Sequence, residues 1–128
     1  MREINRIIIH CSATPAGMDI GRDEIDQWHR ERGWNGIGYH YVIRRNGDIE
    51  FGRPEYEVGA HTRGYNEDSI GICLVGGKDT FDYTADQIAE LVGLVENLEE
   101  RYPDATIHGH NEFSAKLCPR FDVAAFFN

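Results

Sequence analysis

Basic side chains are scarce in this sequence. Its 128 residues carry 13 Lys and Arg against 22 Asp and Glu, a formal net charge of −9. Because a nucleic-acid-binding surface needs a basic face to neutralise phosphates, this composition argues against nucleic acid as a partner. No stretch reaches the roughly 18 apolar residues that a membrane-spanning helix requires, so we expect no membrane insertion.

The sequence also has no room for a signal peptide, because the polar segment 1–6 runs directly into the first apolar stretch. We therefore expect synthesis in the cytoplasm. No linker, repeat or low-complexity segment divides the chain, and a chain of this length can enclose one core. We predict a single domain over residues 1–128.

Cysteine is rare, and the three cysteines cannot all form disulfides. Cys11 and Cys73 lie in apolar, strand-like stretches, where a small buried thiol is the common outcome. Cys118 differs because it lies in a polar loop immediately before Pro119, where a free thiol would be a liability without a metal. It is the one thiol that we interpret as a ligand.

Hydrophobic periodicity predicts an α/β sandwich, with a mixed central sheet of about five strands flanked by helices. Asn46-Gly47 is a two-residue hairpin signal between two of the strands. Thr84 and Gln87 form a capping box at the start of a long amphipathic helix. We expect strands over residues 6–10, 39–44, 48–51, 69–75 and 105–108, and helices over 25–32, 85–102 and 123–127.

Residues typical of metal ligands gather near the C-terminus. His110 and Cys118, with seven residues between them, are too close for independent sites and too far apart for one helical turn. A catalytic zinc takes three protein ligands and keeps one position for water. The best third ligand is His10, which ends the first buried strand, and His108 is the rival of His110. A lone histidine is more often structural; the combination of the three favours a metal site.

Short motifs follow one another along nearly the whole chain, over about residues 7–122: Ile9-His10-Cys11-Ser12-Ala13-Thr14, Gly38-Tyr39-His40, Gly59-Ala60-His61, Gly64-Tyr65-Asn66 through Ser69-Ile70-Gly71, and His110 through Pro119. Together, and in this order, they resemble the zinc N-acetylmuramoyl-L-alanine amidases. The resemblance is greatest to the small phage lysozyme-type amidases, which share a fold with peptidoglycan recognition proteins.

The resemblance implies one Zn²⁺ per chain, bound by His10, His110 and Cys118. The family's spacing from ligand to Lys-x-Cys selects His110 over His108. The helix-borne glutamate of the metalloprotease motif HExxH is absent from the sequence, so general-base chemistry of that kind is unavailable. Glu112 is the nearby carboxylate, with either a direct role or a supporting one.

The resemblance also implies catalytic roles for Lys116, as a donor to the developing negative charge, and for Tyr39, at the attacking water or the tetrahedral intermediate. His61 and Asn66 correspond to residues that line the family's substrate cleft. On an extended strand Tyr39 shares a face with Tyr41, so we expect its side chain to lean over the cleft without supporting the core.

The resemblance implies hydrolysis of the amide bond between N-acetylmuramic acid and L-alanine in peptidoglycan. The short chain looks like a monomeric phage or prophage endolysin, which meets the cell wall only after release. Two other classes stay open: a peptidoglycan-binding module of the same fold without catalysis, and a regulatory protein that binds another protein.

Overall fold

Three consecutive isoleucines, Ile7, Ile8 and Ile9, lie fully buried in the sheet of the computed structural model, which describes residues 2–127. β-branched residues favour the extended pleated backbone, and a strand covered on both faces can be apolar throughout. The strands are β1 (Arg6–Cys11), β2 (Tyr41–Ile43), β3 (Ile49–Phe51), β4 (Ser69–Leu74) and β5 (Thr106–Gly109).

The sheet has the order β3-β2-β4-β1-β5. β1 pairs in parallel with β4 and β5, and β2 pairs in parallel with β4. The hairpin partner β3 runs antiparallel to β2, which makes the sheet mixed. The predicted fold class, a mixed sheet of about five strands flanked by helices, is confirmed.

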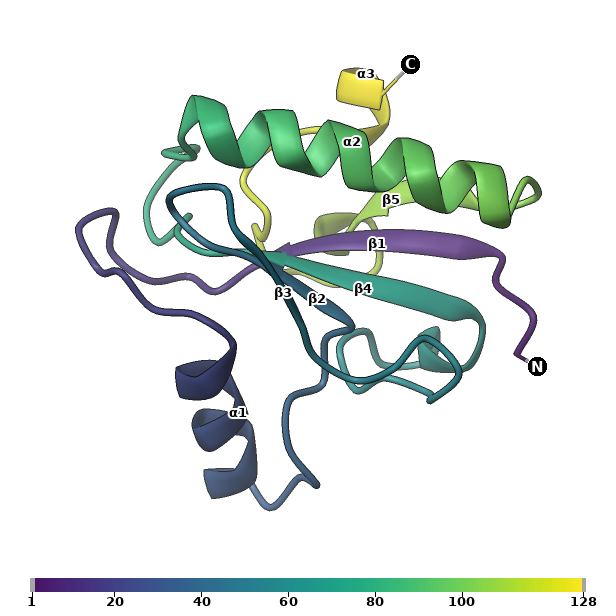
Figure 1. Ribbon diagram of the computed structural model, residues 1–128, viewed down its shortest axis with the longest axis horizontal. Helices are drawn as coiled ribbons and strands as arrows, with labels where there is room; N and C mark the ends of the chain where they lie inside the picture. The colour runs from purple at the N-terminus through teal and green to yellow at the C-terminus, as the bar shows by residue number, and fades with distance from the viewer. Residues whose placement is uncertain (1, 128) are drawn as a thin grey trace.

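Helices cover both faces of this sheet (Figure 1). They are α1 (Arg22–Glu31), α2 (Ala85–Arg101) and α3 (Val123–Phe127). The capping box predicted for α2 is present, with the Gln87 amide donating to the Thr84 hydroxyl at 3.1 Å. Within the described chain, 2–127, no helix combines the length and the apolar character needed to cross a membrane.

Successive side chains of β1 point to opposite faces of the sheet. Ile7 and Ile9 pack in the cluster that includes Leu91, Val95 and Leu98 of α2. His10 therefore faces away from α2, because successive side chains of a strand point to opposite faces. In the strand register it is the neighbour of Cys73, whose side chain belongs to the second cluster together with Ile25 of α1.

The expectation for Tyr39 was wrong in one respect. Tyr41 packs on the α2 side of the sheet, whereas Tyr39 packs against the opposite cluster, beside Val42. The reason is that the strand begins only at Tyr41 and the chain bends at His40, so the alternation of β2 does not extend back to Tyr39. Tyr39 is thus half-buried and supports the core.

Parallel pairing brings the two predicted histidine ligands to one edge of the sheet. The register of β1 and β5 places Ile9 opposite Gly109, so that His10 and His110 follow at the same level. His110 opens a single 3₁₀ turn, His110–Glu112, directly after β5. In open α/β sheets, ligands bind at the carboxyl ends of the strands, and this edge is where the site lies.

Candidate metal centre and active-site cleft

The ligand atoms offered by His10, His110 and Cys118 all lie within 4.8 Å of one another. The rings of His10 and His110 have their centroids 4.5 Å apart. The backbone amide of Cys11 donates to Sγ of Cys118 at 2.9 Å, which ties the C-terminal loop to the end of β1. The chain therefore folds back between His110 and Cys118, which brings the two side chains to one place.

The protonation of these groups suits cation binding. Burial lowers the pKa of His10 well below its ordinary value, and positive charge at His61, His110 and Lys116 acts in the same direction. Burial and then Lys116 lower the pKa of His110 as well. Both imidazoles are consequently neutral near pH 7 and keep a lone pair for a metal.

Cys118 completes a donor set of two nitrogens and one sulfur, which is the kind that zinc takes. A hydrogen bond with Cys11, followed by burial, raises the pKa of the Cys118 thiol. Without a cation the thiol thus holds its proton, and a metal has to displace that proton on binding. The residues present fit a zinc ion with three protein ligands.

Lys116 and Tyr39, the two predicted catalytic residues, both lie near this centre. Lys116 lines the same cavity as His110, and its positive charge acts on both histidines of the group. The ring of Tyr39 lies 5.1 Å from that of His10 and 5.5 Å from that of His29. Burial raises the pKa of Tyr39 well above its ordinary value, so its hydroxyl is a neutral hydrogen-bonding group.

The loop between β3 and β4 brings His61 against the metal group. Nδ1 of His61 lies 2.9 Å from Nε2 of His10, and the two rings meet edge to face. The second ring nitrogen of His61 lies 3.3 Å from Oγ of Ser69. Both nitrogens of His61 therefore have partners inside the protein.

Asn66 holds this loop in shape. Its Oδ1 accepts hydrogen bonds from the backbone amides of His61 and Thr62, at 2.9 and 2.8 Å. The guanidinium of Arg2 also stabilises this loop, because it donates hydrogen bonds to the carbonyl oxygens of Glu55, Asn66 and Glu67. The loop is thus fixed by its own side chains and by the N-terminal segment.

The remaining histidines and Glu112 have structural partners. His108 lies outside the metal group and bonds Glu112 at 2.9 Å and Thr106 at 2.6 Å. Glu112 also accepts from the Gly109 amide. His29 and His40 are buried, and their Nδ1 atoms accept from the backbone amides of Gly38 and Gly71, respectively.

A cavity of about 400 Å³ opens beside the centre. Two of its lining side chains, Arg63 and Lys116, are basic, and no carboxylate belongs to the described residues that line it. Two other lining residues, Trp34 and Thr62, were not predicted from the sequence. The only local signals were that Trp34 follows Gly33 and that Thr62 follows His61. The lining residues are Trp34, Ala60, His61, Thr62, Arg63, Gly64, Asn66, His110 and Lys116.

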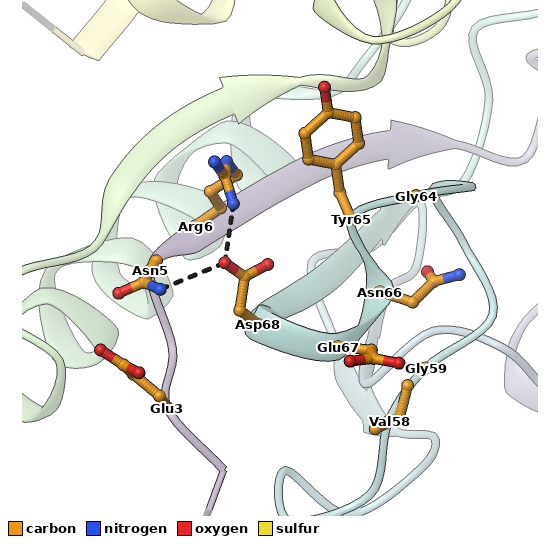
Figure 2. Close-up of a pocket in the computed structure, with 10 residues that line it drawn as sticks. All are labelled: Glu3, Asn5, Arg6, Val58, Gly59, Gly64, Tyr65, Asn66, Glu67 and Asp68. Carbon is orange, nitrogen blue, oxygen red and sulfur yellow. Dashed lines mark hydrogen bonds and ion pairs between the residues drawn. The ribbon is translucent and has the colours of Figure 1, made fainter.

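A larger cavity of about 690 Å³ is lined in part by residues 64–68 (Figure 2). Its wall contains the ion pair of Arg6 with Asp68, at 2.7 Å, and a hydrogen bond from Asn5 to the same carboxylate. It shares Gly64 and Asn66 with the smaller cavity but contains none of the metal group. The smaller cavity is therefore the candidate active-site cleft.

Fold and site together define an α/β protein with a zinc-type donor set at the carboxyl edge of a largely parallel sheet. The chain belongs to the N-acetylmuramoyl-L-alanine amidase family, whose model matches residues 1–121. It is 44% identical over 127 residues to the endolysin of Klebsiella phage KP32, covering 95% of this chain and 84% of that protein. It is 46% identical over 122 residues to the endolysin of Escherichia phage T7, covering 91% of this chain and 81% of that one.

Solved structures show the same fold. The N-acetylmuramoyl-L-alanine amidase LysC from Clostridium intestinale superposes with a TM-score of 0.86 at 31% identity, covering 98% of this chain and 83% of that chain. Wild-type Drosophila PGRP-LB superposes with a TM-score of 0.81 at 27% identity, and the match covers 99% of this chain and 81% of that chain. The fold is thus common to lytic amidases and to proteins named for peptidoglycan recognition.

Proposed function

We propose that this chain is an endolysin that hydrolyses the amide bond between N-acetylmuramic acid and L-alanine in peptidoglycan, using one Zn²⁺ at His10, His110 and Cys118. The observation that carries the proposal is the convergence of these three donors within 4.8 Å at the edge of a cleft. The family match and the phage endolysins among its relatives support the substrate. When bound, zinc supplies Lewis acidity toward water and toward the scissile carbonyl.

Lys116 acts on the developing negative charge. Its ammonium group has no lone pair with which to ligate a metal, and it lies on the cleft beside His110. As the scissile carbonyl carbon becomes tetrahedral, the ammonium donates a hydrogen bond to the carbonyl oxygen. A fixed donor of this kind stabilises the transition state more than the ground state.

Tyr39 contributes a neutral hydroxyl. Because burial keeps its proton in place, the residue serves as a hydrogen-bond donor or acceptor and not as a phenolate base. Its ring packs against the cluster around Val42, and the ring centroid lies 5.1 Å from that of His10, so Tyr39 has a set position beside the metal group. It either orients the attacking water or stabilises the tetrahedral intermediate.

His61 and Asn66 line the side of the cleft that receives the substrate. The ring nitrogens of His61 and the Oδ1 of Asn66 are engaged within the protein, so they meet substrate through the ring edge and the amide nitrogen, respectively. The basic cleft residue Arg63 suits the carboxylates of a peptidoglycan stem peptide, although the protein as a whole is acidic.

We further propose that the protein acts as a monomer. It is made in the cytoplasm and meets the cell wall only after release. Neither nucleic acid nor a membrane is needed for this activity, and the one macromolecular partner is peptidoglycan.

Digestion of purified peptidoglycan tests the proposed reaction. The expected products are new L-alanine amino termini, in step with loss of turbidity and without new reducing ends. A chelator should stop the reaction and added zinc should restore it. New reducing ends without free amino termini would instead show a glycosidase and overturn the proposal.

Tyr39→Phe separates an enzyme from a binding module of the same fold. The substitution keeps the ring that packs beside Val42 and removes only the hydroxyl. We expect muropeptide affinity to change little and turnover to fall by about 100-fold, the scale for a group acting mainly on the transition state. Binding by the wild-type protein without any release of stem peptide, even with zinc added, would identify a recognition module.

A further inference from the structure

The outer nitrogen of His10 has two partners on one loop. Nε2 lies 2.9 Å from Nδ1 of His61 and 3.1 Å from Oγ1 of Thr62, and that hydroxyl lies 2.9 Å from the same His61 nitrogen. His10 and Thr62 are only 1% and 2% exposed, so water cannot readily replace either partner. The contacts form a closed group of three polar atoms beside the metal centre.

The hydroxyl of Thr62 contacts His10 and His61 and is not needed for the backbone hydrogen bonds of its own loop. The backbone of Thr62 has its own partners, because its amide donates to Asn66 at 2.8 Å and its carbonyl accepts from the Tyr65 amide at 2.9 Å. The shape of the loop therefore does not depend on the hydroxyl. A valine would fill nearly the same volume and leave both backbone bonds in place.

The protons of the group can be ordered in only two directions. A neutral imidazole has one N–H, and a hydroxyl has one proton to donate. In the first order, His10 donates from Nε2 to Thr62, Thr62 donates to Nδ1 of His61, and His61 donates from Nε2 to Ser69. In the reverse order, Thr62 donates to Nε2 of His10, which then carries its proton on Nδ1.

The two orders differ in whether His10 keeps a free lone pair that can bind a metal. In the first, Nδ1 of His10 is bare and its lone pair is free. In the reverse order, one nitrogen of His10 carries a proton and the other accepts from Thr62, so no lone pair of the ring is free. Ser69 is fully buried, and its Oγ lies 3.3 Å from Nε2 of His61. In the first order this oxygen accepts a hydrogen bond from His61.

We propose that Thr62 is a positioning residue for the metal centre: its hydroxyl accepts from Nε2 of His10 and donates to His61, which holds His10 in the tautomer with Nδ1 free for the ion. The inference rests on the proposed function, in which His10 is a ligand. Residues that hold the outer nitrogen of a ligating histidine fix the orientation and basicity of its ring, and their loss typically weakens metal binding by about 10- to 100-fold.

Metal affinity of three variants tests the role of the hydroxyl. Thr62→Val removes it, Thr62→Ser keeps it, and Thr106→Val removes a hydroxyl that lies 2.6 Å from Nε2 of His108, a histidine outside the metal group. Zinc affinity is measured by competition with a chromophoric chelator, and the geometry of the centre by the visible spectrum of the Co²⁺ form.

We expect Thr62→Val to bind zinc about 10- to 100-fold more weakly with an altered Co²⁺ spectrum. Thr62→Ser and Thr106→Val should bind as the wild type does. Wild-type affinity in Thr62→Val would overturn the inference, and so would equal losses in Thr62→Val and Thr106→Val.

A second measurement needs no variant. In the chelator-treated wild type, nitrogen-15 NMR of the histidine rings should find the proton of both His10 and His61 on Nε2. A proton on Nδ1 of His10 would contradict the proposed order even if Thr62→Val failed to fold. A wild-type protein that bound no zinc would instead overturn the proposed metal centre, and the two failures are thereby distinguished.

Discussion

The imidazole of His61 lies against the backbone of Gly71, so closely that a methyl group on Gly71 would stand 2.6 Å from both Cγ and Cδ2 of the ring. Gly71 is in the middle of β4, and its amide donates to Nδ1 of His40. The missing side chain at position 71 is therefore what lets His61 contact the sheet and His10 at the same time.

Gly71→Ala should lower both the stability of the protein and its zinc affinity, because the added methyl group clashes with His61. The added methyl group has to displace the His61 ring or the strand, and overpacking of this kind costs about 1–3 kcal/mol of unfolding free energy. Urea denaturation and zinc competition should both show a loss. Gly93→Ala is the matched control. Apart from the neighbouring residues and the backbone of α2 itself, no described heavy atom lies within 4 Å of the added group, and alanine has a higher helix propensity than glycine. Unchanged zinc affinity in Gly71→Ala would mean that the position of His61 does not matter to the centre.

Two histidines separated by a single residue should respond differently to substitution. His110→Ala removes a donor of the metal group, so we expect loss of stoichiometric zinc and of amidase activity. His108→Ala removes contacts with Thr106, Glu112 and the ring of Phe113, none of which belongs to the metal group, and should keep both properties. The measurements are metal content after dialysis and turbidity loss of peptidoglycan. Zinc retained by His110→Ala and lost by His108→Ala would reverse the assignment.

Lys116→Ala should separate catalysis from metal binding. Loss of one oxyanion donor typically lowers the rate by about 100- to 1000-fold, whereas the ligands stay in place. The control is Lys78→Ala, which removes the other lysine of the sequence, an exposed residue outside the lining of the cleft. Steady-state rates and zinc content are measured on the same preparations. Full activity in Lys116→Ala would exclude the proposed role.

Glu55 should make stability depend on pH in acid. Burial by itself would raise the pKa of Glu55, but hydrogen bonds from Arg101, Tyr102 and Tyr41 outweigh it and lower the pKa to about 2. Because the folded pKa is below the ordinary value of 4.5, the stabilisation is complete above about pH 5 and is lost as the pH falls toward 2.

Glu55→Gln should therefore lower the free energy of unfolding by about 1–2 kcal/mol at pH 7, after allowance for partial exposure of the pair. The difference from the wild type should shrink as the pH is lowered from 5 to 2. Glu100→Gln, on the exposed surface of α2, serves as the control. A difference that stayed constant over this pH range would show that the charge of Glu55 is not its cause.

Local patterns in the sequence determined the elements of this protein. The isoleucines of β1, the hairpin at Asn46-Gly47 and the capping box at Thr84 each act within a few residues, so the strands and α2 could be predicted with small errors at their ends. The residue types of His10, His110 and Cys118 suggested a metal site, because zinc takes these donors.

Tertiary structure alone decided which of these residues meet. His10 and His110 are adjacent because β1 pairs with β5 in a register that no local pattern specifies. The same holds for the packing of His61 on Gly71, for the hydroxyl of Thr62 beside two histidines, and for Tyr39, whose predicted face was wrong because the chain bends before β2 begins. The contacts of His10 with His61, Thr62 and His110 join segments far apart in the chain, and their formation depends on the packing of the whole sheet against its loops.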